Sequence, residues 1–213
     1  KPIRKKLMPL VEILTEQYPQ IKSISMNCNP KKTNVILGDS TETLWGKDTI
    51  TDTMCGNAVD LSPESFYQVN TIQAERLYGA AKEFAQLTGK ERLLDLYCGA
   101  GTIGLSMADA VLELVGVEIV PEAVENAKEN AARAGVNAAF FCGDAGSIAG
   151  KLAEQGTAPD VIVVDPPRKG CDEAALWAMV QMQPERIVMI SCNATTAARD
   201  CAMLSRMGYA AER

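Results

Sequence analysis

The chain has 213 residues, of which 47% are hydrophobic, and this is enough for one α/β domain with a smaller attached unit. Its net charge of −6, with the acidic excess confined to residues 71–213, excludes a protein that binds polyanions over its whole surface. The absence of histidine excludes every mechanism that needs a Ser-His or Cys-His pair and every metal site that needs imidazole.

Seven cysteines are present, and no two of them form a Cys-x-x-Cys pattern. The odd number and the spacing argue against a disulfide framework and against a zinc or iron–sulfur site in this chain. Free thiols are typical of a reducing compartment, so we expect a cytoplasmic monomer without a metal. No apolar run reaches the roughly 18 residues of a membrane span, and no apolar signal region follows the basic residues 1–6, so we expect no membrane contact.

Residues 1–62 read as a small α+β unit. A helix is predicted over residues 7–18, and alternating apolar and polar residues predict strands at 21–27, 33–37 and 49–53.

Residues 63–213 read as a second domain, in which helices and strands alternate after a helix at 71–87. This alternation indicates βαβ units and a Rossmann-like parallel sheet. The predicted strands are 92–97, 114–118, 137–142, 160–164 and 186–191, and the helices between and after them are 102–110, 121–134, 146–155, 172–181 and 195–207.

The loop after the first of these five strands is rich in glycine. Residues 99–104 fit G-x-G-x-x-G, a pattern that lets a ligand approach the backbone at a helix N-terminus. Asp95 stands at the strand end, where a carboxylate repels a pyrophosphate but attracts the sulfonium and amino groups of S-adenosylmethionine. Tyr97 and Cys98 open the loop and are placed to pack on such a ligand, and Gly99 begins the glycine pattern beside it.

Acidic residues follow the next two strands. Glu118 is placed to accept both hydroxyls of a ribose, and a surface carboxylate is the plainer alternative. Because NAD also carries a ribose, Glu118 leaves an NAD-dependent oxidoreductase open. Asp144 is in register to bond an adenine amine, or else it caps the following helix.

The turn at residues 165–169 reads Asp-Pro-Pro-Arg-Lys. Its prolines stiffen the backbone and remove donors, so the carboxylate of Asp165 is held in a fixed place. The basic pair Arg168 and Lys169 suits a phosphate backbone with a base held nearby, whereas a rigid loop with solvated charges is the alternative.

Cys192 follows the strand at 186–191 and precedes the helix at 195–207. Most free cysteines are buried and inert, but a helix N-terminus stabilises a thiolate, and Arg199 is placed to add to this effect. Because the carboxyl ends of parallel strands line one crevice, we expect this thiol to meet the glycine loop and the Pro-Pro turn there. A thiolate beside a methyl donor implies covalent catalysis.

With these motifs the sequence resembles the RNA uracil-C5 methyltransferases, which act on 23S ribosomal RNA and on tRNA. The resemblance runs from about residue 20 to the end. It rests on residues 34–38 (Asn-Val-Ile-Leu-Gly), 65–70 (Ser-Phe-Tyr-Gln-Val-Asn), 95–101 (Asp-Leu-Tyr-Cys-Gly-Ala-Gly), 165–170 (Asp-Pro-Pro-Arg-Lys-Gly) and 191–193 (Ser-Cys-Asn).

The resemblance implies an S-adenosylmethionine-dependent enzyme that methylates C5 of a uridine, in 23S ribosomal RNA rather than in tRNA. It makes Cys192 the nucleophile that adds to C6, and it makes Asp165 the residue that orients the uracil. A non-catalytic RNA-binding module remains an alternative. The residues that it implies as contacts of the methyl donor or the base are Gln68, Tyr97, Glu118, Asp144 and Asp165, beside the glycine loop at Gly99.

The sequence also departs from this family. Ala194 stands where the family usually has proline. The family's C-terminal segment with a catalytic glutamate, and the RNA-binding barrel and iron–sulfur cysteines that many members carry, have no counterpart in this sequence. We therefore expect the central and catalytic portion of such an enzyme: a Rossmann-like methyltransferase sheet that lacks its last two strands, preceded by the small α+β unit.

Overall fold

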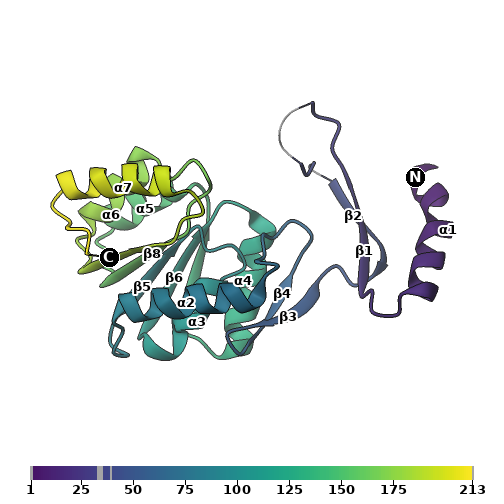
Figure 1. Cartoon of the computed structure of the whole chain (residues 1–213), viewed down its shortest axis with the longest axis horizontal. Helices are drawn as coiled ribbons and strands as arrows, with labels where there is room; N and C mark the ends of the chain where they lie inside the picture. The colour runs from purple at the N-terminus through teal and green to yellow at the C-terminus, as the bar shows by residue number, and fades with distance from the viewer. Residues whose placement is uncertain (1, 33–35, 39, 213) are drawn as a thin grey trace.

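The computed structural model describes residues 2–32, 36–38 and 40–212, and these form three sheets (Figure 1). The largest sheet has five parallel strands in the order β7-β6-β5-β8-β9. Its strands are β5 (Arg92–Leu96), β6 (Glu113–Glu118), β7 (Ala138–Cys142), β8 (Val161–Val164) and β9 (Arg186–Met189).

Helices cover both faces of this sheet (Figure 1). One layer holds α2 (Thr71–Ala85), α3 (Thr102–Met107) with the following 3-10 turn η1 (Ala108–Ala110), and α4 (Pro121–Ala134); the other holds α5 (Ala145–Glu154), α6 (Glu173–Gln181) and α7 (Ala194–Arg206).

Each face of the sheet has its own apolar core. Successive side chains of a strand point to opposite faces, so Leu93 and Val163 enter one core while Leu94 and Ile162 enter the other. The predicted α/β class with a Rossmann-like parallel sheet is thereby confirmed. In the described part of the chain, no helix combines the length and the apolar character that a membrane span requires.

The strand order reverses beside β5. From β5 the chain winds outward to β6 and β7, and it then returns to place β8 on the other side of β5. At such a switch point the loops on the two sides turn away from each other and leave a crevice outside the carboxyl ends of the strands. The loops after β5, β6, β8 and β9 therefore open at one edge.

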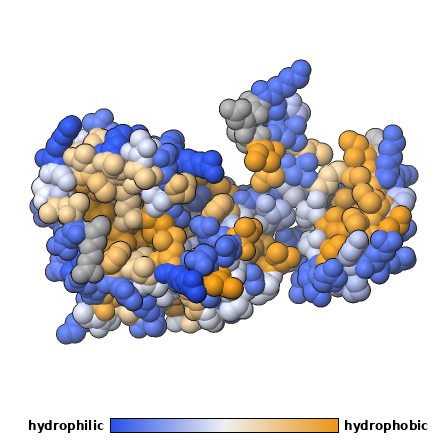
Figure 2. Space-filling model, in the orientation of Figure 1, coloured by the Kyte–Doolittle hydropathy of each residue, from blue (hydrophilic) through white to orange (hydrophobic). Residues whose placement is uncertain are grey.

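The N-terminal part extends away from the sheet layers (Figure 1). It contains α1 (Pro2–Gln17) and an antiparallel pair, β1 (Ser23–Cys28) with β2 (Ser40–Gly46). Helix α1 buries Val11 but leaves Ile3, Leu10 and Ile13 more than half exposed. Figure 2 shows hydrophobic surface over α1.

A second hairpin, β3 (Ile50–Met54) with β4 (Asn57–Leu61), lies against α4. Its residues Met54, Val59 and Leu61 share a core with β5 and β8. The division predicted between residues 62 and 63 remains a prediction.

The sequence reading missed β2 and β4. Strand β4 contains Asn57 and Asp60, which are poor strand formers, and its pairing across the Cys55-Gly56 turn overrides that preference. The strand predicted at 33–37 lies partly outside the described residues, and its last two residues have irregular backbone. Helix α1 begins at Pro2, five residues before the predicted start, because proline suits a first turn and the basic residues after it favour helix.

Candidate active site

The glycine loop makes a tight turn from β5 into α3. Gly99 and Gly101 have φ of 54° and 84°, which glycine adopts without strain. Tyr97 has φ of 66°, a conformation that costs a non-glycine residue free energy and is found most often at functional sites. The amide of Gly101 donates to the Cys98 carbonyl over 2.8 Å and closes the turn.

Asp95 lies under this turn and is 1% exposed. Its Oδ2 accepts a 2.8 Å hydrogen bond from the Gly104 amide, while its Oδ1 is buried without a partner in the described structure. Burial, aided by the negative charges of Asp165 and Glu118, raises the pKa of Asp95 to about 8. A buried carboxyl oxygen without a donor is suited to a cationic ligand, because a positive charge nearby favours the ionised form.

Glu118 ties the end of β6 to the glycine loop. Its Oε2 accepts from the Gly99 amide at 3.0 Å, and its Oε1 accepts from the amides of Ile119 at 2.8 Å and Val120 at 2.9 Å. Because three backbone amides donate to it, Glu118 is not merely a solvated surface carboxylate. A carboxylate has about four lone-pair sites, so these three bonds leave capacity for a ligand hydroxyl.

The segment at residues 65–70 lies over the glycine loop. The Phe66 carbonyl oxygen is 4.0 Å from the position that a Cβ on Gly99 would take. The side chain of Asn126 on α4 holds this segment, because its Oδ1 accepts from the Ser62 amide at 3.0 Å and from the Ser65 hydroxyl at 2.9 Å. Gln68 follows Phe66 by two residues, and its contact with a methyl donor remains a prediction.

Tyr97 faces the other helical layer. Its ring packs against the core beneath α5 and α6. Burial raises the pKa of the Tyr97 hydroxyl, and the neighbouring Cys171 and Asp172 add to the shift. Asp144 is exposed and caps α5, since its Oδ1 accepts from the Ser147 amide at 3.0 Å. The capping alternative is thus observed for Asp144, and an adenine contact remains a prediction.

Asp165 ends β8 on the other side of the crevice. The Asp165 side chain is half-buried, and this burial raises its pKa to about 6. The charge of Asp165 also contributes to the raised pKa of Asp95. The turn after it is closed by a 2.8 Å hydrogen bond from the Gly170 amide to the Pro167 carbonyl.

The loop that carries Cys192 is bonded directly to this Pro-Pro turn. Asn193 caps α7 and donates from Nδ2 to the Arg168 carbonyl at 3.1 Å, and the Thr196 hydroxyl donates to the same oxygen at 3.3 Å. The Cys192 thiol is exposed. A solvent-accessible thiol at a helix N-terminus has the setting of a reactive cysteine.

The hydrogen bonds of Arg199 do not support the expectation that it stabilises a thiolate at Cys192. The Arg199 guanidinium donates to Asp200 Oδ1 at 2.6 Å and to the carbonyls of Lys169 at 2.9 Å and Cys171 at 3.1 Å. Arg199 lies two helical turns beyond Cys192 in sequence, and there its side chain reaches the loop after β8 instead.

The sequence reading also missed buried polar residues that hold the loops. Asn130 is fully buried; its Oδ1 accepts from the Asp60 amide at 2.7 Å, and its Nδ2 donates to the carbonyls of Asp60 at 3.2 Å and Ala100 at 3.1 Å. It therefore joins β4 to the glycine loop. The sequence feature that could have identified these residues is the spacing of Asn126 and Asn130, which lie four residues apart on the alanine face of α4.

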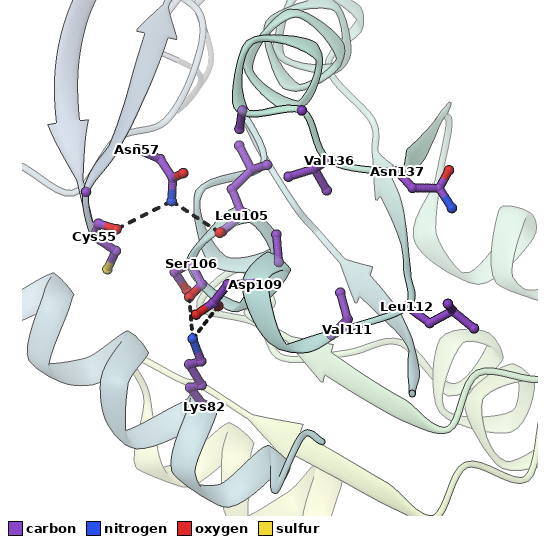
Figure 3. Close-up of a pocket in the computed structure, with 14 residues that line it drawn as sticks. Cys55, Asn57, Lys82, Leu105, Ser106, Asp109, Val111, Leu112, Val136 and Asn137 are labelled. Carbon is purple, nitrogen blue, oxygen red and sulfur yellow. Dashed lines mark hydrogen bonds and ion pairs between the residues drawn. The ribbon is translucent and has the colours of Figure 1, made fainter. Parts of the chain in front are cut away.

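A cleft of about 570 Å³ lies at the opposite edge of the sheet from the glycine loop, near the amino ends of β6 and β7 (Figure 3). In it Lys82 donates to the Ser106 carbonyl and pairs with Asp109, while Asn57 donates to the Leu105 carbonyl at 3.2 Å (Figure 3). The predicted site residues do not line this cleft. Within residues 2–32, 36–38 and 40–212, no three His, Cys, Asp or Glu side chains are grouped to hold a metal ion.

A family model described as a methyltransferase domain matches residues 87–200, which run from the end of the α2 segment through the glycine loop and into α7. The chain belongs to the methyltransferase domain family. This membership argues against the NAD-dependent oxidoreductase, which the glycine loop and Glu118 had allowed as an alternative.

Curated relatives of this methyltransferase are bacterial and longer. An RNA methyltransferase of Halalkalibacterium halodurans, described as uncharacterized, is 50% identical over 201 residues, which are 94% of this chain and 44% of the relative. One of Clostridium acetobutylicum with the same description is 47% identical over 201 residues, again 94% and 44%. The chain thus spans less than half the length of these relatives.

Among solved structures, the tRNA (uracil-54, C5)-methyltransferase of Pyrococcus abyssi, in complex with S-adenosyl-L-homocysteine, superposes with a TM-score of 0.72. It is 31% identical, and the match covers 89% of this chain and 46% of that one. The methyltransferase therefore has the Rossmann-like fold of S-adenosylmethionine-dependent methyltransferases, and S-adenosylmethionine is its cofactor class.

Proposed function

We propose that this methyltransferase transfers a methyl group from S-adenosylmethionine to C5 of a uridine in RNA, in 23S ribosomal RNA rather than in tRNA. The observation that carries the proposal is the direct bonding of the Cys192 loop to the turn that follows Asp165, next to a glycine loop beneath which the buried Oδ1 of Asp95 lacks a hydrogen-bond donor. The RNA methyltransferase descriptions of the relatives and the uracil-C5 activity named for the Pyrococcus abyssi neighbour support it.

In this proposal the donor lies over the glycine loop. Glu118 accepts a ribose hydroxyl with its remaining lone-pair site, and Asp95 faces the positive end of the donor. Gln68 and Tyr97 close the pocket from the two helical layers, and Asp144 bonds the adenine. A donor held there would supply its methyl group to a base held between Asp165 and Cys192.

The chemistry follows from the poor nucleophilicity of uracil C5. The Cys192 thiolate adds to C6 of a uridine that has left its base stack, and the electrons of the C5–C6 double bond form an enolate. C5 attacks the methyl carbon, the carbon–sulfur bond breaks, and S-adenosylhomocysteine leaves. A base removes the C5 proton, the double bond re-forms, and Cys192 is expelled as thiolate. The family resemblance assigns that base to a glutamate of a segment that this sequence does not contain.

The half-buried Asp165 is suited to hold the uracil edge. With its pKa raised to about 6, Asp165 is still mostly ionised at pH 7, so the carboxylate is able to accept a hydrogen bond from an N–H of the base. The neighbouring Arg168 and Lys169 are exposed on the turn, where they are free to meet phosphates on either side of the flipped nucleotide.

Nucleoside mass spectrometry tests this function on RNA treated with a form of the protein that also carries the family's glutamate-bearing segment, since the proposed mechanism needs that base. We expect 5-methyluridine to form in 23S ribosomal RNA in the presence of S-adenosylmethionine, and we expect Cys192→Ala to abolish it. A Cys201→Ala variant, which changes a thiol on α7 outside the crevice, is the matched control and should keep the activity. Methylation of tRNA alone would overturn the choice of RNA, and a methylated base other than uracil would overturn the chemistry.

A further inference from the structure

Helix α7 is bonded to a run of consecutive backbone groups after the Pro-Pro turn. Asn193 and Thr196 donate to the Arg168 carbonyl, as described above. Further along α7, Arg199 donates to the carbonyls of both Lys169 and Cys171. Asp200 completes the set, since its Oδ2 accepts from the Cys171 amide at 2.8 Å.

Gly170 shows how closely this loop lies on the helix. Its φ is 80°, and a Cβ added to it would lie 2.4 Å from Arg199 Nη2 and 2.5 Å from Asp200 Oδ2. A Cβ there would displace the ends of the Arg199 or Asp200 side chains, and the positive φ also disfavours any residue other than glycine. The close approach and the five hydrogen bonds together fix residues 168–171 on α7.

Asp200 is an unusual residue for this position, because its side chain is fully buried. A buried carboxylate is costly unless it is paired and hydrogen-bonded. Here its Oδ1 accepts from Arg199 Nε at 2.8 Å and Nη2 at 2.6 Å, and its Oδ2 accepts from Cys171. An ion pair with such directional partners specifies one geometry of the loop, which an apolar contact does not.

We propose that Arg199 and Asp200 are a positioning pair, which holds the loop after β8 on α7 and thereby fixes Asp165 relative to Cys192. The proposal rests on the proposed function, in which both of these residues act on one uracil. Asp165 precedes the held loop and Cys192 precedes α7, so any slip between loop and helix changes their separation. A misplacement of about 1 Å between reacting groups is enough to cost about 100-fold in rate.

The test compares Arg199→Ala with Arg206→Ala, which removes an exposed arginine from the last turn of the same helix. The first readout is the rate of adduct formation between Cys192 and RNA that contains 5-fluorouracil. We expect Arg199→Ala to slow it about 10- to 100-fold. Affinity for S-adenosylhomocysteine should change less than about 3-fold, because the described contacts of the glycine loop do not involve α7. Arg206→Ala should alter neither quantity, and Arg199→Lys, which keeps the charge beside Asp200, should restore part of the rate.

A second readout needs no reaction. Hydrogen exchange at the amides of Gly170 and Cys171 should accelerate at least about 10-fold in Arg199→Ala and remain unchanged in Arg206→Ala. Unchanged exchange, or faster exchange with a normal adduct rate, would overturn the positioning role. So would an equal loss of donor affinity, which indicates a general loss of structure.

The two proposals fail in different ways. If the unaltered protein forms no adduct at Cys192, the proposed function falls, and the exchange experiment still decides whether α7 holds the loop. Gly170→Ala gives an independent variant, because it pushes the loop from α7 without removing a charge. It should reproduce the slow adduct formation of Arg199→Ala, and a normal rate in Gly170→Ala would contradict the inference.

Discussion

The buried carboxyl of Asp95 makes a quantitative prediction about stability. In the folded protein the pKa of Asp95 is raised to about 8, whereas an aspartate in an unfolded chain has a pKa of about 3.9. The folded state therefore binds the proton more tightly. The contribution of Asp95 to stability is fully present below about pH 4, and it is lost progressively as the pH rises to about 8.

The magnitude follows from this window. Each pH unit between the two pKa values costs about 1.4 kcal/mol, so the free energy of unfolding should fall by about 4 kcal/mol between pH 4.5 and pH 7.5 on account of Asp95. Asp95→Asn removes the ionisation but keeps an oxygen that is able to accept from the Gly104 amide. The variant should therefore be less stable than the parent at pH 4.5, or equal to it, and more stable at pH 7.5.

Urea denaturation of both proteins at the two pH values measures the effect. Subtracting one protein from the other removes the pH dependence of the groups that do not interact with Asp95. Asp48→Asn, which changes an exposed carboxylate, is the control and should track the parent. If the stabilities of Asp95→Asn and the parent change in parallel with pH, the pKa of Asp95 is not raised in the folded protein. The argument that its unpaired oxygen is suited to a cationic ligand would then fail.

Three further outcomes are expected. Glu118→Ala should weaken S-adenosylhomocysteine binding by about 1–3 kcal/mol in calorimetry, while Glu122→Ala, in the first turn of α4, should not; equal affinity in both would remove Glu118 from the donor site. Changing Arg168 and Lys169 together to alanine should weaken RNA binding and lower the slope of log affinity against log salt by about 1–2; an unchanged slope would place the phosphates elsewhere. Asn130→Ala should lower the free energy of unfolding by about 1–3 kcal/mol, because it leaves buried backbone groups of β4 and the glycine loop without partners; a change below about 0.5 kcal/mol in urea denaturation would contradict this.

Local chemistry explains why much of the fold was predictable. The limits of α4 follow from Pro121 in its first turn and from Gly135, whose φ of 67° ends it. Asn70 caps α2, since its side chain accepts from the Gln73 amide. The parallel sheet then places the residues that follow each strand at one edge, which is why acidic, glycine-rich and thiol-bearing loops were expected to meet there.

Contacts distant in sequence explain what was missed. Asn130 bonds a residue 70 positions away, and Asp200 bonds one 29 positions away, so neither partner is visible in a local pattern. Arg199 was assigned to Cys192 from its nearness in sequence, whereas packing turns it toward Asp200. Strand β2 was missed because the pairing of an antiparallel strand depends on a partner, here β1, rather than on its own composition.

The account depends most directly on the identity of the nucleophile. When RNA that contains 5-fluorouracil is incubated with the protein and S-adenosylmethionine, the fluorine at C5 cannot leave as a proton, so the covalent intermediate should accumulate. Denaturing electrophoresis and peptide mapping should find one adduct, on Cys192, and none in Cys192→Ser, because a serine hydroxyl is a far weaker nucleophile at neutral pH and has no general base here. An adduct that survives Cys192→Ser, or one that maps to Cys98 or Cys171, would contradict the account.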